Sequence, residues 1–197
     1  MSCRAAATCG AQVQAASEAA RTELTRLTGG AAYERWQSPS SSLLMLEADA
    51  GGVSGLDLGD SRVFALDATC AVHVKGGVEG TRDAEAPRRQ PNKPTPTNRC
   101  CSGPRRCADP TCAAHARTWS LDLARPAHLL LMTDGFAALA DQYGAYDAAG
   151  LVRAALHKGL QELGRELRAI ENADAGGAQH PRFKKSDDAT ALLLRLA

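Results

Sequence analysis

The chain has 197 residues, of which 44% are apolar and 23% are charged, so it is long enough to form one domain with a hydrophobic core. Its net charge of +1 and its 4% aromatic content argue against a general attraction to nucleic acids or anionic membranes. It contains no run of about 18 apolar residues and no apolar signal-peptide region, so we expect a cytoplasmic protein without a membrane partner.

The first part of the chain predicts one helix followed by antiparallel strands. Within residues 11–28, apolar side chains recur at steps of three and four and form one helical face. A tight break is expected at Gly59-Asp60, between two alternating segments. The predicted strands of this meander fall within residues 41–49, 54–67 and 70–75.

Residues 76–117 interrupt this pattern. They show neither strand nor helix periodicity and are rich in Pro, Arg, Cys and Gly. A loop of this length without regular structure is uncommon inside a compact domain. We therefore interpret residues 76–117 as an irregular or disordered insertion in a single domain that spans residues 1–197.

Regular structure is expected to resume after the insertion. Asp147 can cap a long helix over about residues 147–172. We expect its apolar stripe to pack on a sheet through Leu156, Leu160, Leu163, Leu167 and Ile170. The other predicted elements are strands at 118–123, 127–135 and 188–196, and a short helix within 136–144.

Carboxylates stand at the ends of several predicted strands. Asp60 follows one strand, Asp134 follows another, and Asp187-Asp188 precede the last. Each motif alone is a common turn. Antiparallel pairing of the last two strands, however, would bring Asp134 and Asp187 side by side. Clustered carboxylates repel one another unless a cation lies between them, and all-oxygen ligands suit Mg²⁺ or Mn²⁺.

Three segments together resemble the metal-dependent protein phosphatases of type 2C. They are LGDSRVFAL (58–66), LLLMTDGF (129–136) and SDDATALLL (186–194), in this order and with a helix between the last two. The resemblance implies an α+β fold, with an antiparallel β-sandwich flanked by helices. It also implies hydrolysis of phosphoserine and phosphothreonine by a metal-activated water, with two Mn²⁺ or Mg²⁺ ions as cofactors and a phosphoprotein as the substrate.

The resemblance also assigns residues to the site. Asp134 and Asp187 correspond to metal ligands, while Asp60, Gly135 and Asp188 stand at supporting positions of the family motifs. The family's first metal-binding Asp-Gly motif has no counterpart in the first fifty residues. The phosphatase-like domain therefore looks incomplete at its N-terminal strands, and we expect weak or no turnover from this chain.

Two other interpretations remain open. One is a non-catalytic binding protein with the phosphatase fold. The other is a zinc-binding module, although its candidate ligands lack the paired spacing of structural zinc sites. These ligands are Cys100, Cys101, Cys107, Cys112 and His115. The sequence does not determine the oligomeric state.

Overall fold

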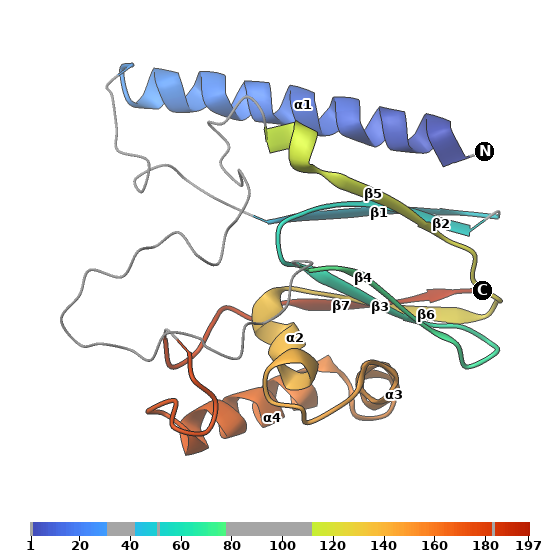
Figure 1. Cartoon of the computed structure of the whole chain (residues 1–197), viewed down its shortest axis with the longest axis vertical. Coiled ribbons are helices and arrows are strands. Elements are labelled where there is room, and N and C mark those ends of the chain that lie inside the picture. Colours follow the sequence, from blue (N-terminus) through green and yellow to red (C-terminus); the bar gives the residue numbers. More distant parts are fainter. Residues whose placement is uncertain (1, 31–41, 51, 78–111, 183) are drawn as a thin grey trace. The chain divides into compact units, whose positions relative to one another are not determined.

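The structure is a computed structural model that describes residues 2–30, 42–50, 52–77, 112–182 and 184–197 (Figure 1). The chain divides into two compact units. The first comprises Met1–Gly59 and Pro94–Asp122, and the second comprises Asp60–Lys93 and Leu123–Ala197. None of the helices in the described ranges is both long and apolar enough to cross a membrane.

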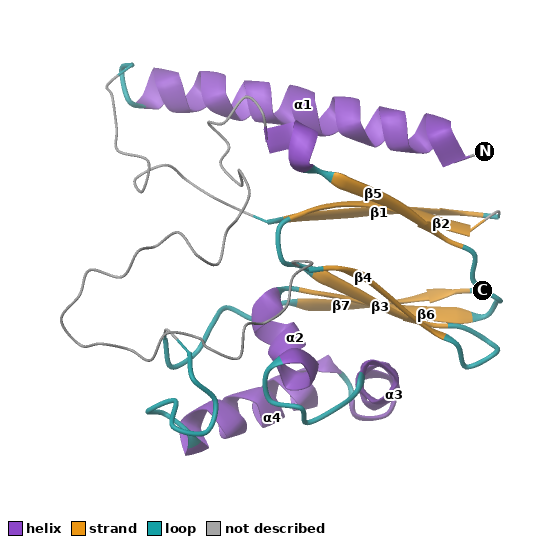
Figure 2. Ribbon diagram, viewed as in Figure 1, coloured by secondary structure: helices purple, strands orange, loops and turns teal. Residues whose placement is uncertain are grey.

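The first unit contains a three-stranded antiparallel sheet in the order β1-β2-β5, with helix α1 along one of its faces (Figure 2). The central strand carries a buried carboxylate, Asp57, which accepts hydrogen bonds from the guanidinium of Arg117 and from Nε1 of Trp119. The elements are α1 (Ser2–Leu27), β1 (Leu43–Asp49), β2 (Gly52–Leu58), the 3-10 helix η2 (Cys112–His115) and β5 (Arg117–Leu121).

The second unit contains a four-stranded antiparallel sheet in the order β4-β3-β6-β7, with three helices on one face (Figure 1). Apolar side chains of the inner strands β3 and β6 pack against these helices around the fully buried Leu130, Leu139 and Leu151. The strands are β3 (Arg62–Leu66), β4 (Val72–Gly76), β6 (Ala127–Met132) and β7 (Ala191–Leu196), and the helices are α2 (Asp134–Asp141), α3 (Ala148–Lys158) and α4 (Leu160–Ala173).

The predicted α+β class is confirmed, since the chain forms two antiparallel sheets with helices against them. The predicted continuous meander is wrong at Gly59-Asp60. There the chain leaves one sheet and enters the other, so β2 and β3 do not pair. The physical reason is that each of these strands already has partners on both edges, β1 and β5 for β2, and β4 and β6 for β3.

The single long helix predicted over residues 147–172 is also wrong. Gly159 has a φ of 83° and ends α3, and α4 begins at the next residue. Asp147 caps α3 as expected, with its side chain accepting a hydrogen bond from the backbone N–H of Gly150. Because the axis breaks, the stripe is not continuous: Leu163 is fully buried, whereas Leu156 is 42% exposed.

Regular structure extends into both ends of residues 76–117, the segment predicted to be an irregular insertion. Strand β4 extends to Gly76, η2 covers Cys112–His115, and β5 begins at Arg117. Residues 78–111 lie outside the described part of the chain. The single-domain organisation stays a prediction.

Candidate metal centre

Strands β6 and β7 bring Asp134 and Asp187 to the same end of the second sheet. The two strands are antiparallel neighbours in which Met132 pairs with Ala191, so the chain leaving β6 meets the chain entering β7. Thr133 extends this pairing: its N–H donates to the carbonyl of Thr190 at 3.0 Å, and its Oγ1 accepts from the N–H of Thr190 at 3.0 Å. The side-by-side placement expected from the sequence is therefore present.

Gly135 allows the two segments to approach closely. A Cβ atom on Gly135 would lie 2.2 Å from the carbonyl oxygen of Asp188 and 3.1 Å from Cβ of Asp187. Any larger residue would therefore push the Asp187-Asp188 segment away from the start of α2. The glycine that follows Asp134 has a steric function here, because it lets helix α2 begin directly against the segment that carries Asp187.

The carboxylates of this end of the sheet act on one another electrostatically. Burial raises the pKa of Asp134, and the charges of Asp60 and Asp187 raise it further, against the lowering effects of the Gly135 N–H and of Lys184. Asp134 is exposed on one side, but the protein around its carboxylate removes enough water for desolvation to be the largest cause of the raised pKa. The structure thus places three acidic side chains near one another.

Asp60 reaches this place because β3 is the other neighbour of β6. Arg62, at the start of β3, pairs with Met132 at the end of β6, and Asp60 lies two residues earlier. The guanidinium of Arg62 also forms an ion pair with Asp141 at 2.9 Å, which ties the start of β3 to the last residue of α2.

Asp187 has two further partners. Its Oδ1 accepts a hydrogen bond from the N–H of Asp188 at 2.8 Å. The same oxygen forms an ion pair with Nζ of Lys184 at 2.5 Å. The Asp187 carboxylate is also the largest cause of a raised pKa at Lys184. Asp188 itself is exposed, and its carbonyl rather than its carboxylate makes the contacts with Gly135 and with Oγ1 of Thr133.

The donor chemistry suits a hard cation. Asp134 and Asp187 offer carboxylate oxygens, which are the ligands that Mn²⁺ and Mg²⁺ prefer. Within the described ranges, however, no three or more His, Cys, Asp or Glu side chains are grouped closely enough to hold a metal ion. Two carboxylates alone could hold at most one ion, which would keep much of its hydration, with Asp60 contributing charge from nearby.

Sequence reasoning did not identify three of the basic residues around this centre. Arg62 and Lys184 contact acidic residues as described above, and Arg168 on α4 donates to the carbonyl of Asp187 at 2.8 Å. The spacing of Lys184, three residues before Asp187, was an available signal. Arg168 had none, because a backbone carbonyl has no signature in the sequence.

The zinc interpretation concerns residues that the structure describes only in part. Cys100, Cys101 and Cys107 lie outside the described residues. Cys112 and His115 are the first and last residues of η2, and the His115 residue is exposed.

Comparisons with known proteins assign no family to this chain. No protein-family model matches it, and no curated protein does. Among solved structures it is similar to PppA, described as a key regulatory component of T6SS in Pseudomonas aeruginosa, with a TM-score of 0.49 and 19% sequence identity. The alignment covers 95% of this chain and 69% of that one.

Proposed function

We propose that this chain is a metal-dependent, phosphatase-like protein whose substrate is a phosphoserine or phosphothreonine monoester. In this proposal Asp134 and Asp187 hold a Mn²⁺ or Mg²⁺ ion. The observation that supports it most directly is the mutual proximity of Asp60, Asp134 and Asp187: after burial, the charges of Asp60 and Asp187 are the largest causes of the raised pKa of Asp134. A cation between such carboxylates would remove this repulsion.

A divalent ion in this place would supply Lewis acidity toward water and toward a phosphoryl oxygen. Asp134 and Asp187 would hold it through their carboxylate oxygens. The backbone N–H groups of Gly135 and Asp188 keep these carboxylates oriented, since they donate to Oδ1 of Asp134 at 2.9 Å and to Oδ1 of Asp187 at 2.8 Å. Lys184 would have to yield its contact with Asp187 or share it.

A non-catalytic binding protein with the same fold is the second candidate. Two carboxylates leave most of an ion's coordination to water, and no third donor is grouped with them in the described ranges. A second ion at a short distance would be strongly repelled and would need more anionic ligands. We therefore expect weak ion binding and slow turnover at best, and binding without turnover is the limiting case.

The test combines ion binding with turnover. Mn²⁺ affinity is measured by calorimetry, and hydrolysis of p-nitrophenyl phosphate and of a phosphothreonine peptide is followed with and without Mn²⁺. Asp134→Asn should abolish both Mn²⁺ binding and hydrolysis. The matched control is Asp122→Asn, which changes an exposed aspartate directly after β5 and should leave both unchanged. Mn²⁺ binding without hydrolysis would favour the second candidate. Failure to bind Mn²⁺ at millimolar concentrations would refute the proposed metal centre.

A further inference from the structure

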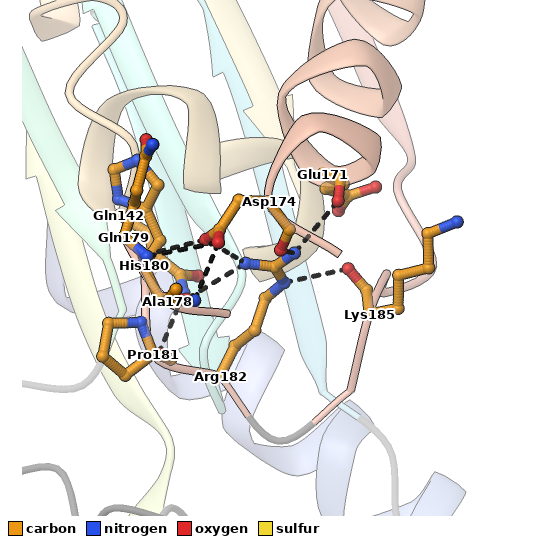
Figure 3. A network of polar contacts seen from close by, with 9 residues as sticks. All are labelled: Gln142, Glu171, Asp174, Ala178, Gln179, His180, Pro181, Arg182 and Lys185. Atoms are coloured by element: carbon orange, nitrogen blue, oxygen red, sulfur yellow. Dashed lines mark hydrogen bonds and ion pairs between the residues drawn. The ribbon is translucent and has the colours of Figure 1, made fainter. Parts of the chain in front are cut away.

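Between α4 and Asp187 the described residues form no helix or strand, yet a dense set of hydrogen bonds orders them (Figure 3). The first part of this network is the carboxylate of Asp174, whose side chain is 6% exposed. It accepts from the N–H groups of Ala178 at 2.7 Å, Gln179 at 3.2 Å and His180 at 2.9 Å. These bonds hold the pKa of Asp174 well below its usual range, with the bond from His180 as the largest cause.

Arg182 forms the second part of the network. Its side chain is 9% exposed, and all three guanidinium nitrogens donate. Nη1 donates to Oδ2 of Asp174 at 2.9 Å and to the carbonyl of His180 at 3.0 Å. Nη2 donates to the carbonyls of Glu171, at 3.1 Å, and Asp174. Nε donates to the carbonyl of Lys185 at 2.9 Å, so Arg182 ties the end of α4 to the residue two positions before Asp187 (Figure 3).

Arg168 forms the third part and reaches Asp187 directly. Its Nη2 donates to the carbonyl of Asp187 at 2.8 Å, and its Nη1 donates to Oε2 of Glu171 at 2.6 Å. Glu171 is only 2% exposed, so it fixes the direction of the guanidinium. A planar guanidinium with two acceptors at fixed angles restricts its partners more than a single point charge would.

Two helices therefore meet the main-chain carbonyls of the Asp187-Asp188 segment, one through a hydrogen bond and one through a close steric contact. Helix α4 holds Asp187 through Arg168, and the first turn of α2 meets the Asp188 carbonyl at Gly135. The same helix α2 carries Asp134 at its first position. Fixing the segment against both helices fixes the direction in which the Asp187 carboxylate leaves the chain, which is what a metal ligand requires.

We propose that Arg168 and Arg182 are positioning residues for Asp187, which hold its carboxylate toward Asp134. This inference rests on the proposed function. Neither arginine would touch the ion or the substrate, since both act through the carbonyl groups of Asp187 and Lys185. The alternative is that the network only caps the end of α4. That alternative predicts a loss of stability without a specific effect on Asp187.

The decisive comparison uses two ion pairs on the same helix. In the double variant Arg168→Met/Glu171→Gln, both partners change, so no buried charge is left alone. The matched control is Arg165→Met/Glu162→Gln, which removes an exposed pair of the same spacing and makes no contact with Asp187. Arg168→Lys keeps the positive charge but loses the planar guanidinium that donates to two acceptors at once. Its hydrogen exchange and Mn²⁺ affinity should therefore be intermediate.

Two measurements are made on each variant. Amide hydrogen exchange without metal reports the order of the main chain from Asp187 to Thr190, and calorimetry reports Mn²⁺ affinity. The Arg168 double variant should exchange faster in this segment and should bind Mn²⁺ about fivefold more weakly, as expected from the loss of one hydrogen bond. The control should match the unaltered chain in both measurements.

Arg182 is tested by Arg182→Lys against Arg153→Lys, an exposed arginine of α3. Arg182→Lys should accelerate exchange from Lys184 to Asp188, whereas Arg153→Lys should not. Unchanged exchange and unchanged affinity in both arginine variants would overturn the positioning role. If the unaltered chain binds no Mn²⁺, the proposed function fails, while the exchange comparison still decides whether the arginines order Asp187.

Discussion

Replacement of Gly135 by alanine is the most direct test of how the candidate metal centre is packed. The added Cβ would lie 2.2 Å from the carbonyl oxygen of Asp188, roughly 1 Å inside an ordinary carbon–oxygen contact. The obstacle is backbone, so no flexible side chain can turn aside. We expect Gly135→Ala to move the Asp187-Asp188 segment and to cost about 1–3 kcal/mol, as overpacking in a closed site typically does.

A second helical glycine provides the control. Gly164 lies within α4, and a Cβ there would meet no atom within 4 Å. Gly164→Ala should therefore gain up to about 1 kcal/mol, because alanine is the better helix former. Gly135→Ala also receives part of this gain, so its net loss should be about 1–2 kcal/mol.

Thermal unfolding measures the difference between the two variants. For a chain of this size, 1 kcal/mol shifts Tm by about 2–4 °C. The two changes together differ by about 1–3 kcal/mol, so we expect the melting temperature of Gly135→Ala to lie at least about 2 °C below that of Gly164→Ala. Mn²⁺ affinity should fall in Gly135→Ala alone. If Gly135→Ala melted at or above Gly164→Ala, the close contact with the Asp188 carbonyl would be refuted.

Three further changes test separate contacts. Thr133→Val removes the acceptor for the N–H of Thr190 and should cost about 1 kcal/mol in urea unfolding, whereas Thr133→Ser should restore most of it. The pKa of Asp67 is lowered to about 2, mainly by the hydroxyl of Thr69, so its contribution to stability is present above about pH 4 and is lost as the pH falls toward 2. Asp67→Asn should flatten the profile of Tm against pH in this window, and an unchanged slope would contradict that assignment. Lys184→Gln should strengthen Mn²⁺ binding about threefold relative to Lys185→Gln, because it removes the ammonium group that competes with the ion for Asp187. Equal affinities of the two variants would show that this ion pair does not compete.

Local patterns in the sequence predicted individual elements well. The Asp147 cap lies where turn chemistry placed it. The strand predicted at 127–135 and the short helix predicted within 136–144 are both present, but the strand ends at Met132 and the helix already begins at Asp134. These features depend on residues within a few positions of one another. The end of α3 at Gly159 is also local, but a glycine inside a helical pattern can be either tolerated or a stop, and the pattern alone does not distinguish the two.

The assignment of strands to sheets could not be predicted from the same information. The alternation around Gly59-Asp60 is compatible with a hairpin and with a crossing between sheets. The choice depends on β5 and β6, which follow in the sequence only after residue 116 and take the free edges of β2 and β3. Partners that are distant in sequence therefore decided a question that neighbouring residues left open.

In the candidate site, too, some features could be predicted from the sequence and others could not. The proximity of Asp134 and Asp187 was predictable, because neighbouring antiparallel strands bring their ends together. Their surroundings act mostly through main-chain atoms: the carbonyl of Asp187 meets Arg168, and the carbonyl of Asp188 meets Gly135. Every residue has a carbonyl, so the amino-acid types at positions 187 and 188 do not indicate these contacts. A motif search therefore finds the carboxylates and misses the residues that orient them, although their orientation determines whether two aspartates can hold an ion.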